Sequence, residues 1–290
     1  MTRKKLDFSR YDDAELAAQM MPRQAVPDAE TWLAGDQQLT AELKQRATVI
    51  ENRRYGPGPR QVADIYPAED PGSPVLVFIH GGYWRALSKE VFGYVAGPLQ
   101  ARGISVVLPN YDLCPAISLS AMVTEVAGAL RWVHENAGAF NGDPGSFHIA
   151  GHSAGAHLAA MMLSRDWAAE GLPQLRIKSA MLISGLYDLT PIPRLPVQAD
   201  IRLQAAEIPG LSPLALPLHG NPHCVVAVGG DEPPLWVAQS RAYNDKLRQE
   251  GRTAQLMILP ETHHYSVIRN LAHDDGTLAP MLVNLVQGCA

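Results

Sequence analysis

The chain has 290 residues, of which 47% are hydrophobic and 18% charged, and this balance is typical of a folded enzyme and not of a disordered segment. The formal net charge is −5, and the basic clusters at 3–5 and 53–54 are too short to support nucleic-acid binding. No apolar run of about 18 residues could span a membrane, and no apolar signal-peptide core follows residues 3–5. The three cysteines, Cys114, Cys224 and Cys289, have no CxxC spacing, so we expect a cytoplasmic protein.

The first 60 residues predict two helices, at about 12–21 and 28–47, and the second follows the start signal Pro27-Asp28. We expect this segment to lie over the core as part of a cap. Residues 60–66 (RQVADIY) alternate between polar and apolar side chains, which is typical of an outer strand. A turn-rich stretch then separates them from the central sheet.

The central part of the chain alternates between apolar runs and helix-like stretches. The run at 75–79 (VLVFI) is typical of a parallel strand that is covered on both faces. Further strands are predicted at 104–108, 147–150, 179–184, 224–229 and 254–259, with helices at about 88–102, 119–136, 156–163 and 234–250. This alternation predicts an α/β fold with a mostly parallel sheet and right-handed crossovers.

The segment at 187–222 is rich in proline and cannot form a regular central element. We interpret it as a candidate lid. The whole chain, 1–290, is then expected to be a single α/β domain, with cap elements at 1–60 and 187–222.

The sequence GHSAG at 151–155 fits the G-x-S-x-G nucleophile elbow, because a short apolar strand precedes it and a helical stretch follows it. Ser153 is the expected nucleophile. The sequence HGGYW at 80–84 follows the first buried strand, where glycine-rich loops supply donors to an oxyanion. We expect the amides of Gly82, Tyr83 and Ala154 to form the oxyanion hole.

An acid and a base are expected after the nucleophile, in that order along the chain. Asp231 follows a predicted strand and is favoured as the acid, with Glu232 as the alternative. The base is expected in the loop after the last strand, where His263 and His264 are both candidates. His152 and His157 are interpreted as structural, since no histidine belongs to a cluster with metal-ligand spacing. We therefore expect no metal and no cofactor.

Taken together, these motifs resemble the kynurenine formamidase (arylformamidase) branch of the α/β-hydrolases, near the hormone-sensitive-lipase-like esterases. The resemblance is carried by HGGYW at 80–84, NYDLCP at 110–115, GHSAGAHLA at 151–159, ISGLYDL at 183–189 and HHYS at 263–266. It implies Ser153 as nucleophile, Asp231 as acid and His264 as base. Members of the branch commonly have His-Phe at the base, whereas this chain has His264-Tyr265.

The expected activity is hydrolysis of a formamide or ester bond in a small aromatic substrate, with N-formylkynurenine as the substrate that the resemblance favours. Tyr83, Trp84 and Tyr187 are candidate walls of the substrate pocket. One alternative is a carboxylesterase acting on short acyl esters. The other is a non-catalytic small-molecule receptor with the same fold, which would have no need to keep Ser153, Asp231 and His264 together. A homodimer is left open.

Overall fold

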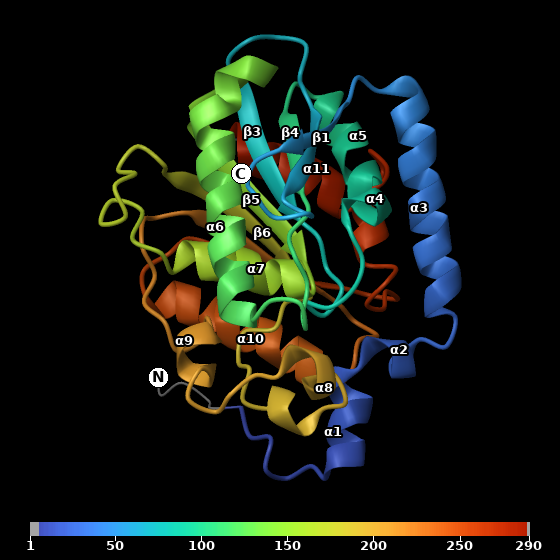
Figure 1. Cartoon of the computed structure of the whole chain (residues 1–290). Coiled ribbons are helices and arrows are strands. Elements are labelled where there is room, and N and C mark those ends of the chain that lie inside the picture. The colour runs from blue at the N-terminus through green and yellow to red at the C-terminus, as the bar shows by residue number, and fades with distance from the viewer. Residues whose placement is uncertain (1–5, 289–290) are drawn as a thin grey trace.

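The computed structural model describes residues 6–288 and contains one eight-stranded sheet with helices on both faces (Figure 1). The strand order is β1-β2-β4-β3-β5-β6-β7-β8, and only β2 runs against the other strands. The prediction of a mostly parallel sheet in an α/β fold is therefore confirmed. The strands are β1 (Ile50–Arg54), β2 (Val62–Tyr66), β3 (Ser73–Ile79), β4 (Ser105–Pro109), β5 (Gly142–His152), β6 (Ile177–Ile183), β7 (His223–Gly229) and β8 (Ala254–Leu259).

Two layers of helices bury the two faces of the sheet. Helices α6 (Leu119–Asn136), α7 (Ala154–Leu163) and α10 (Pro234–Gln249) cover one face, and α4 (Lys89–Phe92), α5 (Ala96–Gln100) and α11 (Leu278–Gln287) cover the other. Helix α3 (Ala29–Arg46) packs outside α4 on the second face, as Figure 1 shows. The two short helices α1 (Asp13–Met20) and α2 (Pro22–Ala25) precede it.

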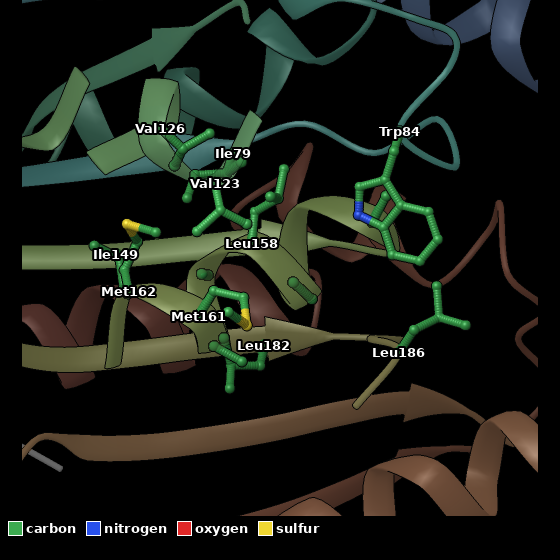
Figure 2. Packing of buried hydrophobic residues seen from close by; sticks show 14 of the residues in the cluster. Ile79, Trp84, Val123, Val126, Ile149, Leu158, Met161, Met162, Leu182 and Leu186 are labelled. Carbon is green, nitrogen blue, oxygen red and sulfur yellow. The ribbon is translucent and has the colours of Figure 1, made fainter. Parts of the chain in front are cut away.

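Helix α7 is held against the sheet by its apolar side chains. Its residues Leu158, Met161 and Met162 are buried in one cluster with side chains of the sheet and of α6, which Figure 2 shows from close by. Removing a side chain of this size from water contributes about 2 kcal/mol. Because β5 enters α7 directly at Ser153, this packing also fixes the position of the turn between them.

Most predicted elements are present within a few residues of their expected bounds. The helices expected at 12–21, 28–47, 119–136 and 234–250 correspond to α1, α3, α6 and α10, and the strand expected at 60–66 is β2. The helix expected at 88–102 is divided into α4, a 3-10 turn at Gly93–Val95, and α5. Helix α11 was not predicted.

Strand β1 corrects the expectation for residues 1–60. It lies inside the segment that we expected to belong wholly to a cap, but it pairs with β2 at the edge of the sheet. All five of its side chains are exposed, so the sequence there lacks the alternation of apolar and polar residues that reveals a half-buried strand.

The proline-rich segment at 187–222 contacts the N-terminal segment. Arg194 donates to the carbonyl oxygens of Phe8 at 3.0 Å and Tyr11 at 2.6 Å, and its Nε lies 2.8 Å from a carboxylate oxygen of Asp13. The segment includes a 3-10 turn at Ile192–Arg194 and the helices α8 (Gln198–Ile201) and α9 (Ile208–Leu211). The two stretches that we expected as separate cap elements are therefore joined by one guanidinium group.

The structure describes only some of the residues on which the expectations about membrane spans, cysteines and basic clusters were based. Within 6–288, no helix is long and apolar enough to cross a membrane. Cys114 and Cys224 are buried free thiols, whereas Cys289 and the basic cluster at 3–5 lie outside the described residues.

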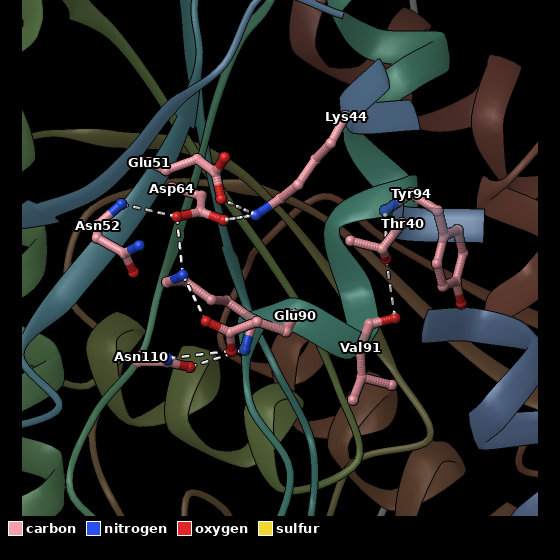
Figure 3. Close-up of polar contacts among 10 residues, drawn as sticks. Thr40, Lys44, Glu51, Asn52, Asp64, Glu90, Val91, Tyr94 and Asn110 are labelled. Atoms are coloured by element: carbon pink, nitrogen blue, oxygen red, sulfur yellow. Dashed lines mark hydrogen bonds and ion pairs between the residues drawn. The ribbon is translucent and has the colours of Figure 1, made fainter. Parts of the chain in front are cut away.

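A buried ionic network ties α3 to the sheet and to α4 (Figure 3). The carboxylate of Asp64 on β2 lies 2.7 Å from Lys44 Nζ on α3 and 2.8 Å from Lys89 Nζ on α4. Asp64 is 2% exposed and Lys89 is 1% exposed. A carboxylate or ammonium group can be buried when it is paired with the opposite charge. The contact between Asp64 and Lys44 therefore fixes the position of α3 against the sheet.

Candidate active site

Ser153 occupies a strained turn between β5 and α7. Its backbone angles are φ 57° and ψ −121°, a conformation that residues other than glycine rarely adopt. An added Cβ at Gly151 would lie 2.4 Å from the carbonyl oxygen of Gly155, and one at Gly155 would lie 2.0 Å from that of Ile79. The turn is so tightly packed that both flanking positions require glycine, and Ser153 lines a pocket at this end of the sheet.

His264 lies beside the serine hydroxyl. The loop after β8 carries it, and its Nε2 atom lies 3.0 Å from Ser153 Oγ. Both residues are 4% exposed. A buried contact of this length between an imidazole and a hydroxyl allows a proton to pass between them.

Glu232, and not Asp231, is the carboxylate that contacts the histidine. His264 Nδ1 lies 2.7 Å from Glu232 Oε2 and donates to it. The other oxygen, Oε1, accepts hydrogen bonds from the amide of Gly229 at 2.8 Å and from the hydroxyl of Ser184. With its N–H on Nδ1, the ring presents the lone pair of Nε2 to Ser153, as a general base must.

Our expectation of Asp231 is thereby corrected to the alternative, Glu232. Asp231 is exposed, and its amide donates to the carbonyl of Thr262 at 2.9 Å. Glu232 is the next residue along the turn, and its extra methylene group lets the carboxylate reach His264 from there. The residue types alone did not show which of the two neighbouring carboxylates turns inward.

The loop at 80–84 brings backbone amides to the pocket. Gly82 has φ 122°, and an added Cβ there would lie 1.9 Å from the carbonyl oxygen of Ala86, so this position requires glycine. Gly82 and Tyr83 line the same pocket as Ser153, and Ala154 is the first residue of α7. Among the described residues, the structure gives the amides of Gly82, Tyr83 and Ala154 no carbonyl partner. Such amides can stabilise a negative charge.

Trp84 and Tyr187 lie in the core and not at the pocket, which differs from the expectation that they form its walls. Both side chains are fully buried. The indole N–H of Trp84 donates to Nδ1 of His157 on α7 at 3.1 Å, and His157 Nε2 donates to the carbonyl of Leu211 at 2.8 Å. The ring of Tyr187 stacks on Tyr243 with 4.2 Å between their centroids. Trp84 thus holds the loop against α7.

The remaining histidines near the site brace its loops. His263 Nδ1 accepts the backbone N–H groups of Tyr265 and Ser266, each at 3.2 Å. His152 Nε2 donates to the carbonyl of His264 at 2.9 Å. Within residues 6–288, no group of three or more His, Cys, Asp and Glu side chains could hold a metal ion.

The pocket in front of Ser153 has a volume of about 220 Å³. The N-terminal segment forms one wall of it, which sequence reasoning placed only generally in a cap. No described residue of 187–222 lines this pocket. Its lining residues are Met21, Pro22, Arg23, Leu33, Asp36, Gly82, Tyr83, Arg85, Ala86, Leu87, Phe92, His152, Ser153, His264, Tyr265 and Ile268.

The buried histidines should make the fold sensitive to acid. Burial lowers the pKa of His157 to about 4, from a usual value of 6.5. The unfolded chain takes up this proton near pH 6.5, whereas the folded chain resists it until about pH 4. The free energy of unfolding should therefore fall as the pH is lowered through this interval, by up to about 3 kcal/mol from this one group.

Denaturant unfolding at pH 7.5, 5.5 and 4.0 checks this prediction. The variant His157→Gln cannot be protonated but keeps a donor and an acceptor, so its stability should depend less steeply on pH than that of the wild type. Equal slopes for the two proteins would show that His157 does not contribute.

Comparisons with known proteins identify the fold family of the chain. A family model described as an alpha/beta hydrolase fold matches residues 76–268. The chain is 34% identical over 256 residues to a kynurenine formamidase of Salmo salar, and the alignment covers 85% of each chain. It is 33% identical over 236 residues to Esterase LipQ of Mycobacterium tuberculosis, covering 72% of this chain and 55% of the esterase.

A solved structure is also similar over nearly the whole chain. It is a protein from Silicibacter sp. TM1040, described as a candidate thioesterase, and it superposes with a TM-score of 0.77 at 30% sequence identity. The match covers 96% of this chain and 99% of that one. These findings confirm the resemblance that the motifs indicated.

Proposed function

Because the chain belongs to the α/β-hydrolase fold family, in the group that contains the kynurenine formamidases, we propose that it hydrolyses arylformamides of the N-formylkynurenine type. The observation that carries the proposal is the buried series of contacts from Ser153 Oγ through His264 to Glu232, at 3.0 and 2.7 Å. This series opens onto a mostly apolar pocket, which suits an aromatic substrate.

In the proposed mechanism, His264 takes the proton of Ser153 while the serine oxygen attacks the formyl carbon. Glu232 stabilises the imidazolium that forms. The amides of Gly82, Tyr83 and Ala154 hold the oxyanion of the tetrahedral intermediate.

The second half of the cycle uses the same groups. His264 returns its proton to the aniline nitrogen, which lets the amine leave and the formyl group stay on Ser153 as an ester. A water molecule, deprotonated by His264, then attacks the carbonyl carbon of this ester. As formate leaves, the imidazolium of His264 returns the proton to Ser153 Oγ, which restores the hydroxyl. Apart from this water molecule, each step needs only residues of this chain, so activity should withstand a chelator such as EDTA.

The experiment compares two substrates on the same protein. We expect kcat/KM for N-formylkynurenine to exceed that for p-nitrophenyl acetate by at least about a hundredfold, a preference equal to roughly 2.7 kcal/mol of transition-state binding. A fluorophosphonate should abolish both activities by reacting with Ser153.

A carboxylesterase is the second candidate, and the similarity to Esterase LipQ favours it. Efficient hydrolysis of short esters without turnover of the formamide would establish that alternative. No turnover of either substrate, together with no reaction with the fluorophosphonate, would favour a receptor.

A further inference from the structure

Asp36 is a carboxylate in the pocket wall that the proposed mechanism does not use. It lies on α3, one turn after Leu33, and both residues line the pocket that contains Ser153. Its side chain is 1% exposed. Asp36 is also the only acidic residue among the described residues that line this pocket.

Only one oxygen of Asp36 has a hydrogen bond within the described part of the chain. Its Oδ1 accepts from Arg269 Nε at 2.7 Å. The guanidinium group is itself held elsewhere, because its Nη2 donates to the carbonyl of Trp32 at 2.8 Å and its carbon lies 4.3 Å from the centre of the Trp32 ring. Arg269 therefore engages Oδ1 and leaves Oδ2 without a partner.

The charge of this carboxylate is incompletely compensated. Burial raises the pKa of Asp36 to about 6, even though the hydrogen bond and the charge of Arg269 act to lower it. A carboxylate with a full set of donors and an adjacent cation has a pKa below its usual range. A second cation at Oδ2 would compensate the remaining negative charge of Asp36.

Asp64 shows what a fully partnered carboxylate looks like under the same helix. Its Oδ2 atom contacts Lys44 at 2.7 Å, and its Oδ1 atom contacts Lys89 at 2.8 Å and the amide of Asn52 at 2.9 Å (Figure 3). Asp64 does not line the pocket. Of these two buried carboxylates, the one that lines the pocket with Ser153 is the one that lacks a cation at its second oxygen.

We propose that Asp36 binds the ammonium group of the substrate, so that the enzyme selects arylformamides that carry a primary amine over those that do not. This inference rests on the proposed function and names the group that sets its specificity. A charged N–H donor and a buried carboxylate form one of the stronger kinds of hydrogen bond. The amino-acid part of an N-formylkynurenine-type substrate supplies such a donor.

The two cationic side chains of the pocket do not remove this preference. Arg23 and Arg85 are about half and two-fifths exposed, at 53% and 39%. Each is already paired, Arg23 with Glu30 at 2.5 Å and Arg85 with Asp200. Solvent screens such surface charges far more than it screens a carboxylate as buried as Asp36.

The test compares N-formylkynurenine with its desamino analogue, in which hydrogen replaces the amine. The wild type should show a kcat/KM at least about tenfold higher for the amine. The isosteric variant Asp36→Asn should lower kcat/KM for the amine by about ten- to a hundredfold, mainly through KM, and change the desamino reaction by less than about threefold.

Asp64→Asn is the matched control, because it removes a buried carboxylate that supports α3 but lies outside the pocket. It should lower both reactions by the same factor. A purely structural role for Asp36 would give this same pattern in Asp36→Asn, and that result would overturn the inference.

The wild type alone also tests the inference, whether or not Asp36→Asn folds. Equal kcat/KM for the two formamides would overturn the role of Asp36 and leave the proposed function intact. Turnover of p-nitrophenyl acetate but of neither formamide would instead overturn the proposed function, and this inference with it.

Discussion

Replacing Ser153 with alanine is expected to lower kcat by about four to six orders of magnitude, because the hydroxyl, the imidazole and the carboxylate act as a unit. The fold should be retained, since alanine can occupy the same turn at a cost close to that of serine. Single-turnover and steady-state rates with N-formylkynurenine provide the measurement.

Ser164→Ala is a suitable control for this variant. Ser164 is the residue that follows α7, eleven residues after Ser153, and its hydroxyl donates to the carbonyl of Ala160. It should retain the wild-type rate. If Ser153→Ala keeps more than about a tenth of the wild-type rate, Ser153 is not the nucleophile.

Glu232→Gln is expected to lower kcat by about three to four orders of magnitude, whereas Asp231→Asn should change it by less than about threefold. Glutamine keeps the shape of the side chain but removes the charge that stabilises the imidazolium. It can also present an N–H group to His264 Nδ1, which would favour the wrong tautomer. Steady-state rates of both variants with the same substrate decide between the two carboxylates.

A third variant separates charge from reach. Glu232→Asp keeps the carboxylate but withdraws it by one methylene group from His264 and from the amide of Gly229, so its rate should lie between those of the wild type and Glu232→Gln. If Asp231→Asn is the variant that loses activity, the contact with Glu232 is not the catalytic one.

The framework of the fold could be predicted because it depends on long apolar runs and on regular helix patterns. The strand at 75–79 has side chains buried on both faces, and α6 repeats apolar residues along one side. Strand β1 could not be found this way, since its pattern of IENRR carries no apolar face. Its pairing with β2 depends on neighbours that lie elsewhere in the chain.

Within the candidate site, the proposed nucleophile Ser153 could be predicted because its turn requires glycine at fixed positions. The proposed acid was harder to predict, because Asp231 and Glu232 are adjacent and both can be ionised. The direction in which each side chain points follows from the packing of the turn against the loop that carries Thr262 and His264. No sequence motif marks Asp36 as a pocket residue, because its place in the pocket depends only on the position of α3.

The ion pairs of Asp64 have a consequence for how this sequence can vary. Lys89 is buried beside it, so a neutral residue at position 64 would remove one of the two carboxylates that pair with this cation and leave it with Glu90, which is about half exposed. Exchanging Lys89 alone would leave Asp64 with one cation, Lys44, and with the amide of Asn52 among the described residues. Among natural sequences with this arrangement, positions 44, 64 and 89 should therefore be inherited together or replaced together, and intermediates with one partner missing should be rare.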